Sequence, residues 1–182
     1  KCLDAGVNWF VYHQATGNTK ELYLNGTTAA YSGTTAWNST TPTSSVVYLG
    51  AHDAGANKSG DDQIAYCFAE KAGYSKFGSY YGNGAADGAF IYTGFRPEWI
   101  LIKPISTGNW QIHDTKRDGY NVKNDNLAPN NDAAEADNQF LDIVSNGFKL
   151  RSSTYSASGV TYIYAAFGQS LVGSNNVPCT AR

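Results

Sequence analysis

The sequence predicts an all-β protein, an antiparallel β-sandwich built from an internal duplication. Three observations favour this fold class. The 182 residues include 19 glycines and 13 tyrosines, and only 15% are charged, which is typical of many short strands joined by tight turns. Apolar residues alternate with a period of two in several segments, whereas a sustained helical period of 3.6 residues is not found. Features of the first half also recur in the second half in the same order.

The internal repeat rests on matching residues that lie about 100 positions apart. Each copy contains a tryptophan strand, a variable Asn-rich region, an apolar strand, an SG turn and an aromatic strand. The order and spacing of these features are too regular for chance. The matching pairs are Trp9 and Trp110, Leu49 and Leu150, Gly60 and Gly159, Ile64 and Ile163, and Phe68 and Phe167.

We therefore treat residues 1–182 as a single domain of about ten strands. Its internal repeats span approximately 1–70 and 97–169, and residues 170–182 form a C-terminal tail. Alternation supports strands in both copies, including the first-copy segments around 46–50 and 63–70. With only four or five strands each, the two halves are expected to share one core.

Residues 71–96 are predicted to be a hairpin linker between the repeats. Two strands flank the turn "YGNGAADG", whose Gly, Asn and Asp residues suit positive-φ positions. Pro97 ends the hairpin, and "PEWILIK" opens the second copy. Lys103 aligns with Lys1, so the first copy lacks its own version of the Trp99–Ile102 strand. That strand either lies upstream in a longer parent chain or comes from a neighbouring subunit, and its absence leaves an exposed edge.

Catalytic chemistry has little support in the sequence. Glu135 and Asp137 lack the third acid of a glycosidase strand, and the neighbouring His113 and Asp114 diverge on a strand. There is no GxSxG elbow and no metal-ligand spacing, so we predict no catalytic residues, no metal and no cofactor. The net charge of −2 argues against nucleic acid as a partner, and there is no membrane-length apolar run.

The three cysteines do not define a disulfide framework. Cys67 lies in the strand-like "QIAYCFAE" and is expected to be a buried thiol. Cys2 and Cys179 lie near the two termini, and whether they pair is left open.

Binding is the more plausible chemistry, and four residues are candidate ligand-binding residues. Tyr31 and Trp37 lie in a loop rich in Thr, Ser and Asn, where an aromatic face could stack on a sugar ring. The alternative is that Trp37 folds back over the sandwich edge. Asn83 and Asp87 lie in the linker turn and could bind a cation or sugar hydroxyls, or simply form the turn.

Several segments resemble a repeated domain of tail-fibre and other virion proteins of marine tailed phages. They are "IAYCFAEKAGYSKFGSYYGNGAADGAFIYTGFRPEWILIK", "GNW", "SNGFKLR", "TYIYAAF" and the ending "VPCTAR". The resemblance covers nearly the whole chain. It implies a jelly-roll sandwich of the concanavalin or SPRY type in a phage appendage.

The function expected from this resemblance is that of a non-enzymatic virion structural protein, extracellular in the virion, on a tail fibre or surface appendage. Its expected partners are other virion proteins and further copies of itself, in a trimer or ring, with a host surface glycan as a further expected ligand. Nucleic acid and membrane insertion are not expected. The alternatives are a capsid-surface decoration protein and a secreted carbohydrate-binding module.

Overall fold

The structure, a computed structural model, describes residues 1–52, 55–117 and 121–169. It confirms an all-β fold with antiparallel sheets. Within these ranges the regular structure is strand, apart from one short 3₁₀ helix at Ser153–Tyr155. The strands are β1 (Phe10–Val11), β2 (Lys20–Tyr23), β3 (Tyr31–Ser32), β4 (Ser75–Tyr81), β5 (Phe90–Tyr92), β6 (Pro97–Pro104), β7 (Gln111–Asp114), β8 (Lys123–Asn126), β9 (Ala136–Val144), β10 (Gly147–Leu150) and β11 (Thr161–Gly168).

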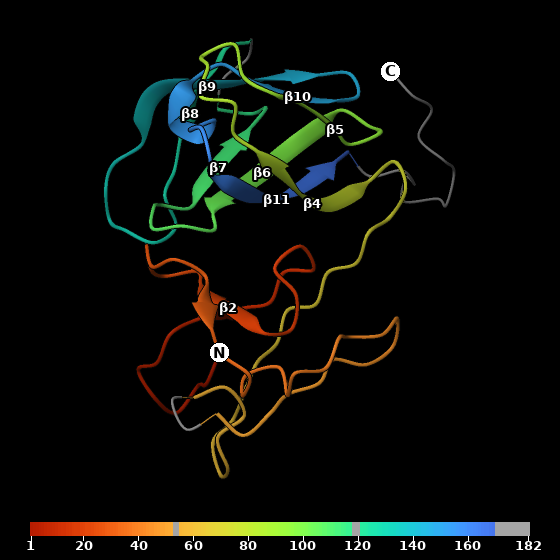
Figure 1. Cartoon of the computed structure of the whole chain (residues 1–182), viewed down its shortest axis with the longest axis vertical. Coiled ribbons are helices and arrows are strands. Elements are labelled where there is room, and N and C mark those ends of the chain that lie inside the picture. The colour runs from red at the N-terminus through yellow and green to blue at the C-terminus, as the bar shows by residue number, and fades with distance from the viewer. Residues whose placement is uncertain (53–54, 118–120, 170–182) are drawn as a thin grey trace.

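Two four-stranded sheets contribute to one hydrophobic core. One sheet has the order β5-β10-β9-β8 and the other the order β4-β11-β6-β7. In Figure 1, β9 and β10 lie above β11 and β4, and the N-terminal part of the chain lies below them. The core between the sheets includes Tyr80, Ile100, Leu141, Phe148 and Tyr162.

The central strands β6 and β11 are covered on both faces. Ile100 and Ile102 of β6 point into the core between the sheets, whereas Leu101 packs against the N-terminal part of the chain. On β11, Tyr164 belongs to the core and Ile163 to the opposite face. Burial on both faces explains why these strands read as nearly continuous apolar runs.

We call residues 1–73 the N-terminal segment. Its small sheet, in the order β1-β2-β3, packs under the β4-β11-β6-β7 sheet through Leu22, which contacts Trp110 and Ile163. The Trp110 Nε1 donates a hydrogen bond of 2.8 Å to the Tyr23 carbonyl. The N-terminal segment is thereby attached to the outer face of the sheet (Figure 1).

The predicted hairpin at residues 71–96 is wrong. Strand β4 pairs with β11 and β5 pairs with β10, so the two strands belong to different sheets. The glycine-rich connection crosses between the sheets at very close range. A methyl group on Gly82 would lie 2.1 Å from the Ala157 carbonyl oxygen, and one on Gly88 would lie 2.7 Å from the Leu150 Cβ. Glycine is therefore required here for close approach of the chain rather than for a hairpin turn.

Two first-copy strands predicted from alternation are not formed. Residues 46–50 contain no strand, and in 63–70 only Gln63 forms an isolated bridge, with Cys2. Cys67 is exposed rather than buried. A strand needs a partner to satisfy its backbone groups, and the described residues place none beside residues 65–68. Cys179 and the tail at 170–182 lie outside the described residues, so the pairing of Cys2 stays open.

Candidate functional site

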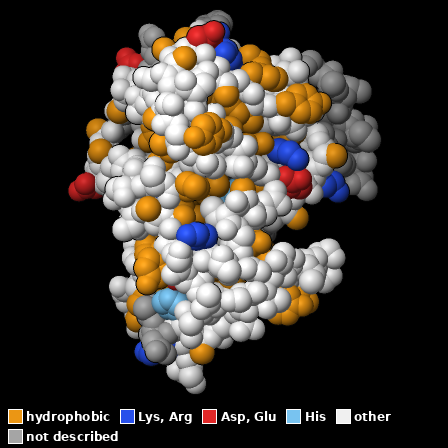
Figure 2. Space-filling model, viewed as in Figure 1, with side chains coloured by type: hydrophobic (Ala, Val, Ile, Leu, Met, Phe, Trp, Pro, Cys, Tyr) orange, Lys and Arg blue, Asp and Glu red, His pale blue; other side chains and the backbone are white. Residues whose placement is uncertain are grey.

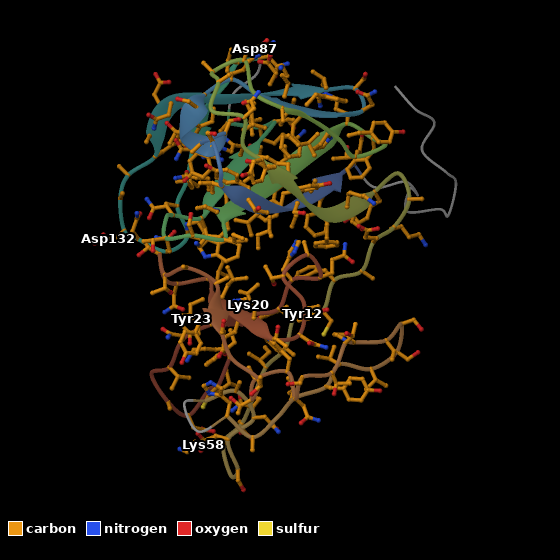
Figure 3. All side chains as sticks on the ribbon, viewed as in Figure 1. Tyr12, Lys20, Tyr23, Lys58, Asp87 and Asp132 are labelled. Atoms are coloured by element: carbon orange, nitrogen blue, oxygen red, sulfur yellow. The ribbon has the colours of Figure 1, made fainter. Side chains whose placement is uncertain are left out.

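Four charged side chains meet on the outer face of the β5-β10-β9-β8 sheet. Leu150 points into the core, so its neighbours Lys149 and Arg151 point outward. Lys149 Nζ lies 2.9 Å from Asp87 Oδ1, and Arg151 Nη1 lies 3.3 Å from the same oxygen. Arg151 Nε also pairs with Asp142 Oδ2 at 2.5 Å. Asp87 lies in the connection before β5, at the upper end of the molecule in Figure 3.

Two exposed aromatic side chains lie beside these charges. Phe90 and Tyr92 on β5 are 48% and 65% exposed, while Ile91 between them is buried in the core. The strand register places Phe90 opposite Lys149, and Lys149 opposite Asp142, so these side chains form a row across three strands. We call the set of six residues the outer-face patch, comprising Asp87, Phe90, Tyr92, Asp142, Lys149 and Arg151.

The electrostatics of the outer-face patch favour binding over proton transfer. The hydrogen bond from Lys149, and its charge, hold the pKa of the Asp87 carboxyl below its usual value. Asp142 is buried, and its Oδ1 has no hydrogen-bond partner among the described residues. A general acid at neutral pH needs a raised pKa, which Asp87 does not have. A polar ligand could instead bond to the ionised groups while an apolar ring face stacks on Tyr92 or Phe90.

Asn83 has a structural role in the connection that holds Asp87. Its side-chain Oδ1 accepts hydrogen bonds from Ser156 Oγ at 2.7 Å and from the Ala85 amide at 3.1 Å. Its Nδ2 donates to the Asp87 carbonyl at 3.4 Å. The side chain therefore orders the turn and has little remaining capacity for a ligand.

Tyr31 and Trp37 lie in the N-terminal segment, and they differ in exposure. Tyr31 is 60% exposed on β3, whereas Trp37 is only 7% exposed. Trp37 Nε1 donates to the Lys20 carbonyl at 3.0 Å, and its ring contacts Tyr12 edge to face. Trp37 is thus buried within the N-terminal segment rather than over the sandwich edge, and it is not available for stacking on a sugar.

The structure does not bring the four candidate residues together. Tyr31 pairs with Glu21 of β2, and Figure 3 shows β2, marked by Lys20 and Tyr23, well below Asp87. Only Asn83 and Asp87 are close neighbours, and of the four only Asp87 belongs to the outer-face patch.

A small open pocket of about 220 Å³ lies where the N-terminal segment meets β11 and the residues after β6. Lys20 is its one charged lining residue, and its Nζ already donates to Ser32 Oγ at 2.6 Å. The Thr16 hydroxyl likewise donates to the His13 carbonyl. These polar groups are engaged within the protein, and unlike the outer-face patch the pocket has no aromatic side chain in its lining. Its lining residues are Ala15, Thr16, Lys20, Ala30, Ile105 and Thr161.

Comparison with known proteins gives a family but no activity. Residues 1–170 match the family model described as a domain of unknown function, DUF7483. The chain belongs to this family. No curated protein matches the chain, and neither does any solved structure.

The described part of this DUF7483 domain has neither a cluster of metal ligands nor a membrane-spanning helix. Among the described residues, no group of three or more His, Cys, Asp or Glu side chains could hold a metal ion. The same part of the chain contains no helix with the length and apolar character needed to cross a membrane.

The sequence interpretation missed five of the six residues of the outer-face patch. One signal was available, because in "GFKLR" the residues Lys149 and Arg151 alternate with Phe148 and Leu150 and so share the outward face. The pairing of that face with Asp87 was not visible, because Asp87 lies more than 60 positions away in the chain.

Proposed function

We propose that this DUF7483 domain is a non-enzymatic structural protein of a phage virion, a component of a tail fibre or surface appendage. The observation that supports it best is the exposed apolar surface of the N-terminal segment, since such surfaces mark interaction sites. This segment holds eight of the thirteen large hydrophobic side chains that are exposed among the described residues. The eight are Leu3, Trp9, Tyr31, Val46, Val47, Leu49, Tyr66 and Phe68. Hydrophobic side chains on the visible face of both halves of the molecule can be followed in Figure 2.

Assembly would bury this surface against other virion proteins or further copies of the chain in a trimer or ring. Native mass spectrometry and cross-linking of purified virions test the proposal. Cross-links from the N-terminal segment to a neighbouring subunit are expected. Absence of the chain from purified virions would overturn the proposal, and cross-links to head proteins alone would favour the capsid decoration protein.

A second proposed role is recognition of a host surface glycan by the outer-face patch. Its support is the combination of two exposed aromatic rings with ionised hydrogen-bonding groups on one face. On a glycan array, Tyr92→Ala and Arg151→Ala should each reduce binding at least about fivefold, because a lost stacking or charged contact is worth about 1–3 kcal/mol. Tyr81→Ala is the matched control, since Tyr81 is equally exposed but lies on β4.

If Tyr92→Ala, Arg151→Ala and Tyr81→Ala all bound glycan equally well, any glycan site would lie outside the outer-face patch. Glycan binding by a chain that never associates with virions would instead favour the secreted carbohydrate-binding module.

The finer fold proposal is a concanavalin-like jelly-roll sandwich that arose by duplication. Matching hydrogen bonds in the two halves support the duplication. The Trp9 amide donates to Asn25 Oδ1, whose Nδ2 donates to Asn8 Oδ1. In the second half, the Trp110 amide donates to Asn130 Oδ1, whose Nδ2 donates to Asn109 Oδ1. The bond from the tryptophan amide is 2.8 Å long in both halves. Superposition of residues 1–70 on 97–169 in an experimental structure tests the idea, and unrelated chain paths would refute it.

A further inference from the structure

The turn before residues 62–69 has the same geometry as the turn before β11. Each turn holds a glycine with positive φ, +86° at Gly60 and +80° at Gly159. In each, the following amide bonds to a carbonyl three residues earlier. The two bonds run from Asp61 to Lys58 and from Val160 to Ala157.

The first backbone pairs after these turns also match. Ile64 exchanges two hydrogen bonds with Lys1, of 2.9 and 3.0 Å, and Gln63 forms an antiparallel bridge with Cys2. The corresponding positions of β11 pair in the same order with the end of β6. Those pairs are Ile163 with Lys103 and Tyr162 with Pro104.

Beyond this point the two segments differ sharply. β11 continues beside β6 up to Gly168, and its Tyr164 and Ala166 are buried. The corresponding residues of the first half, Ala65 and Cys67, are exposed. Within the described part of the chain, the backbone groups of residues 65–68 form no backbone hydrogen bond. Residues 65–68 therefore have the composition of a central strand but no partner strand among the described residues.

We propose that residues 65–68 accept an added β-strand that resembles β6 and comes from outside residues 1–182. The unpaired row of backbone N–H and C=O groups is satisfied by another strand and not by a small ligand. β6 itself is already paired with β11 on one side and β7 on the other, so it is not free to be the donor.

The Lys1–Ile64 pair fixes the register of the added strand. It runs antiparallel to residues 65–68 and ends beside Ala65, because Lys1 takes the place beside Ile64 that Lys103 has beside Ile163. In β6 the residue opposite Phe167 is Trp99, so a large side chain is expected opposite Phe68. A continuous run of apolar residues should follow, as "ILI" follows Trp99 in "PEWILIK", because both faces of the strand would be covered.

This inference goes beyond the proposed virion role and does not depend on it, because strand addition is measured on the purified chain in solution. The first probe is the peptide PEWILI added in trans, which stops short of the places that Lys1 and Cys2 occupy. The second is a variant of the chain extended by PEWILI directly before Lys1. Hydrogen exchange should slow at least about tenfold at the amides of residues 66 and 68 with either probe, because alternate amides face the added strand, in phase with Ile64, and become hydrogen-bonded.

The matched control extension is PEWIPI, in which proline replaces the residue opposite Tyr66 and removes a donor of the added ladder. The variant Tyr66→Pro provides a second control on the acceptor side, at an exposed position whose amide faces the added strand. Both controls should abolish the protection while the exchange of β11 stays unchanged. Protection by the extension alone would indicate a donor that is continuous with the chain, and protection by the peptide as well would indicate donation in trans.

Unchanged exchange at the amides of residues 66 and 68 with both probes would overturn the proposal. That result would leave the virion role intact, because association with virions is measured separately. Conversely, protection by the probes would stand even if the chain were absent from virions.

Discussion

Lys103 is a buried cation whose hydrogen-bond acceptors are neutral carbonyls. Its side chain is fully buried, and Nζ donates to the carbonyls of Pro104 at 2.7 Å and Ser106 at 3.0 Å. Burial disfavours the charged form and lowers the pKa of Lys103 to about 8. The unfolded chain keeps this proton up to a pKa of about 10.4.

The folded state therefore binds fewer protons than the unfolded state above pH 8, and stability should rise with pH. We expect the free energy of unfolding to increase by about 1.5 kcal/mol between pH 8 and 9.5 through this group. Urea denaturation at several pH values measures the increase, and Lys103→Met should remove it. The measurement is kept below pH 10, because above that pH the tyrosines lower the stability as the pH rises. Their pKa values are raised in the folded state, that of Tyr155 to about 12, so the folded state there binds more protons than the unfolded state. An equal slope in the variant would show that the ammonium does not titrate in this range.

Trp9 and Trp110, which the sequence repeat matches, differ in what they contribute to stability. Trp110 is buried and donates to the Tyr23 carbonyl, whereas Trp9 is 36% exposed. Trp110→Phe leaves that carbonyl unpaired and should cost about 1–3 kcal/mol. Trp9→Phe should change stability by less than about 0.5 kcal/mol. Thermal or urea unfolding measures both, and similar losses would mean that the hydrogen bond to Tyr23 does not hold the N-terminal segment in place.

At the scale of elements, β4 shows how an edge strand is covered by side chains. The Phe77 amide donates to Glu70 Oε1 at 3.1 Å, and the Phe77 carbonyl accepts from Gln14 Nε2 at 2.7 Å. Ser75 is paired with Lys71. These contacts occupy groups that would otherwise pair with another chain.

Removing both contacts should open this edge. The double variant Gln14→Ala/Glu70→Ala is expected to raise the self-association constant at least about tenfold, through pairing at β4. Analytical ultracentrifugation over a concentration series measures it. Lys76→Ala is the control, because it removes the ion pair with Glu70 and leaves both contacts to Phe77. Identical sedimentation of the double variant and the control would argue that β4 is not an association edge.

The sequence was sufficient to predict strands that their own composition identifies. It was not sufficient where the structure depends on which distant segment a strand pairs with. Strands β6 and β11 are readable because both of their faces are apolar. The hairpin prediction failed because turn composition does not reveal which sheet each flanking strand joins. The strand predicted at 63–70 has the required composition, but a strand is formed by its neighbour as much as by its own residues.

The candidate site follows the same division. Asp87 was predicted from its turn, which is a local signal. Its partners Lys149 and Arg151 come from a distant strand, and only the packed sheet brings them to it. Trp37 was a candidate for stacking because its loop is polar, yet its indole Nε1 donates a hydrogen bond to the Lys20 carbonyl. Whether a side chain is buried depends on its tertiary contacts, which the composition of its loop does not reveal.

At the scale of the whole molecule, the two halves have unequal cores. Fourteen buried hydrophobic residues form the core between the two four-stranded sheets. The N-terminal segment contributes Leu22 to one small cluster and Ala36, Trp37 and Ala56 to another. Because stability follows buried apolar contacts, this segment should open at a lower free energy than the sheets.

Paired core substitutions test this difference. Ile100→Ala should destabilise the whole fold by about 2–5 kcal/mol, because it leaves a cavity between the sheets. Leu22→Ala should have a cost in the same range but a different consequence, since it loosens the contact with Trp110 and Ile163 alone. Hydrogen exchange with mass spectrometry should show faster exchange throughout the molecule for Ile100→Ala. For Leu22→Ala it should show faster exchange within the N-terminal segment only. Uniformly faster exchange in Leu22→Ala would mean that the segment and the sheets unfold as one cooperative unit, and that the N-terminal segment stabilises the sheets despite its small core.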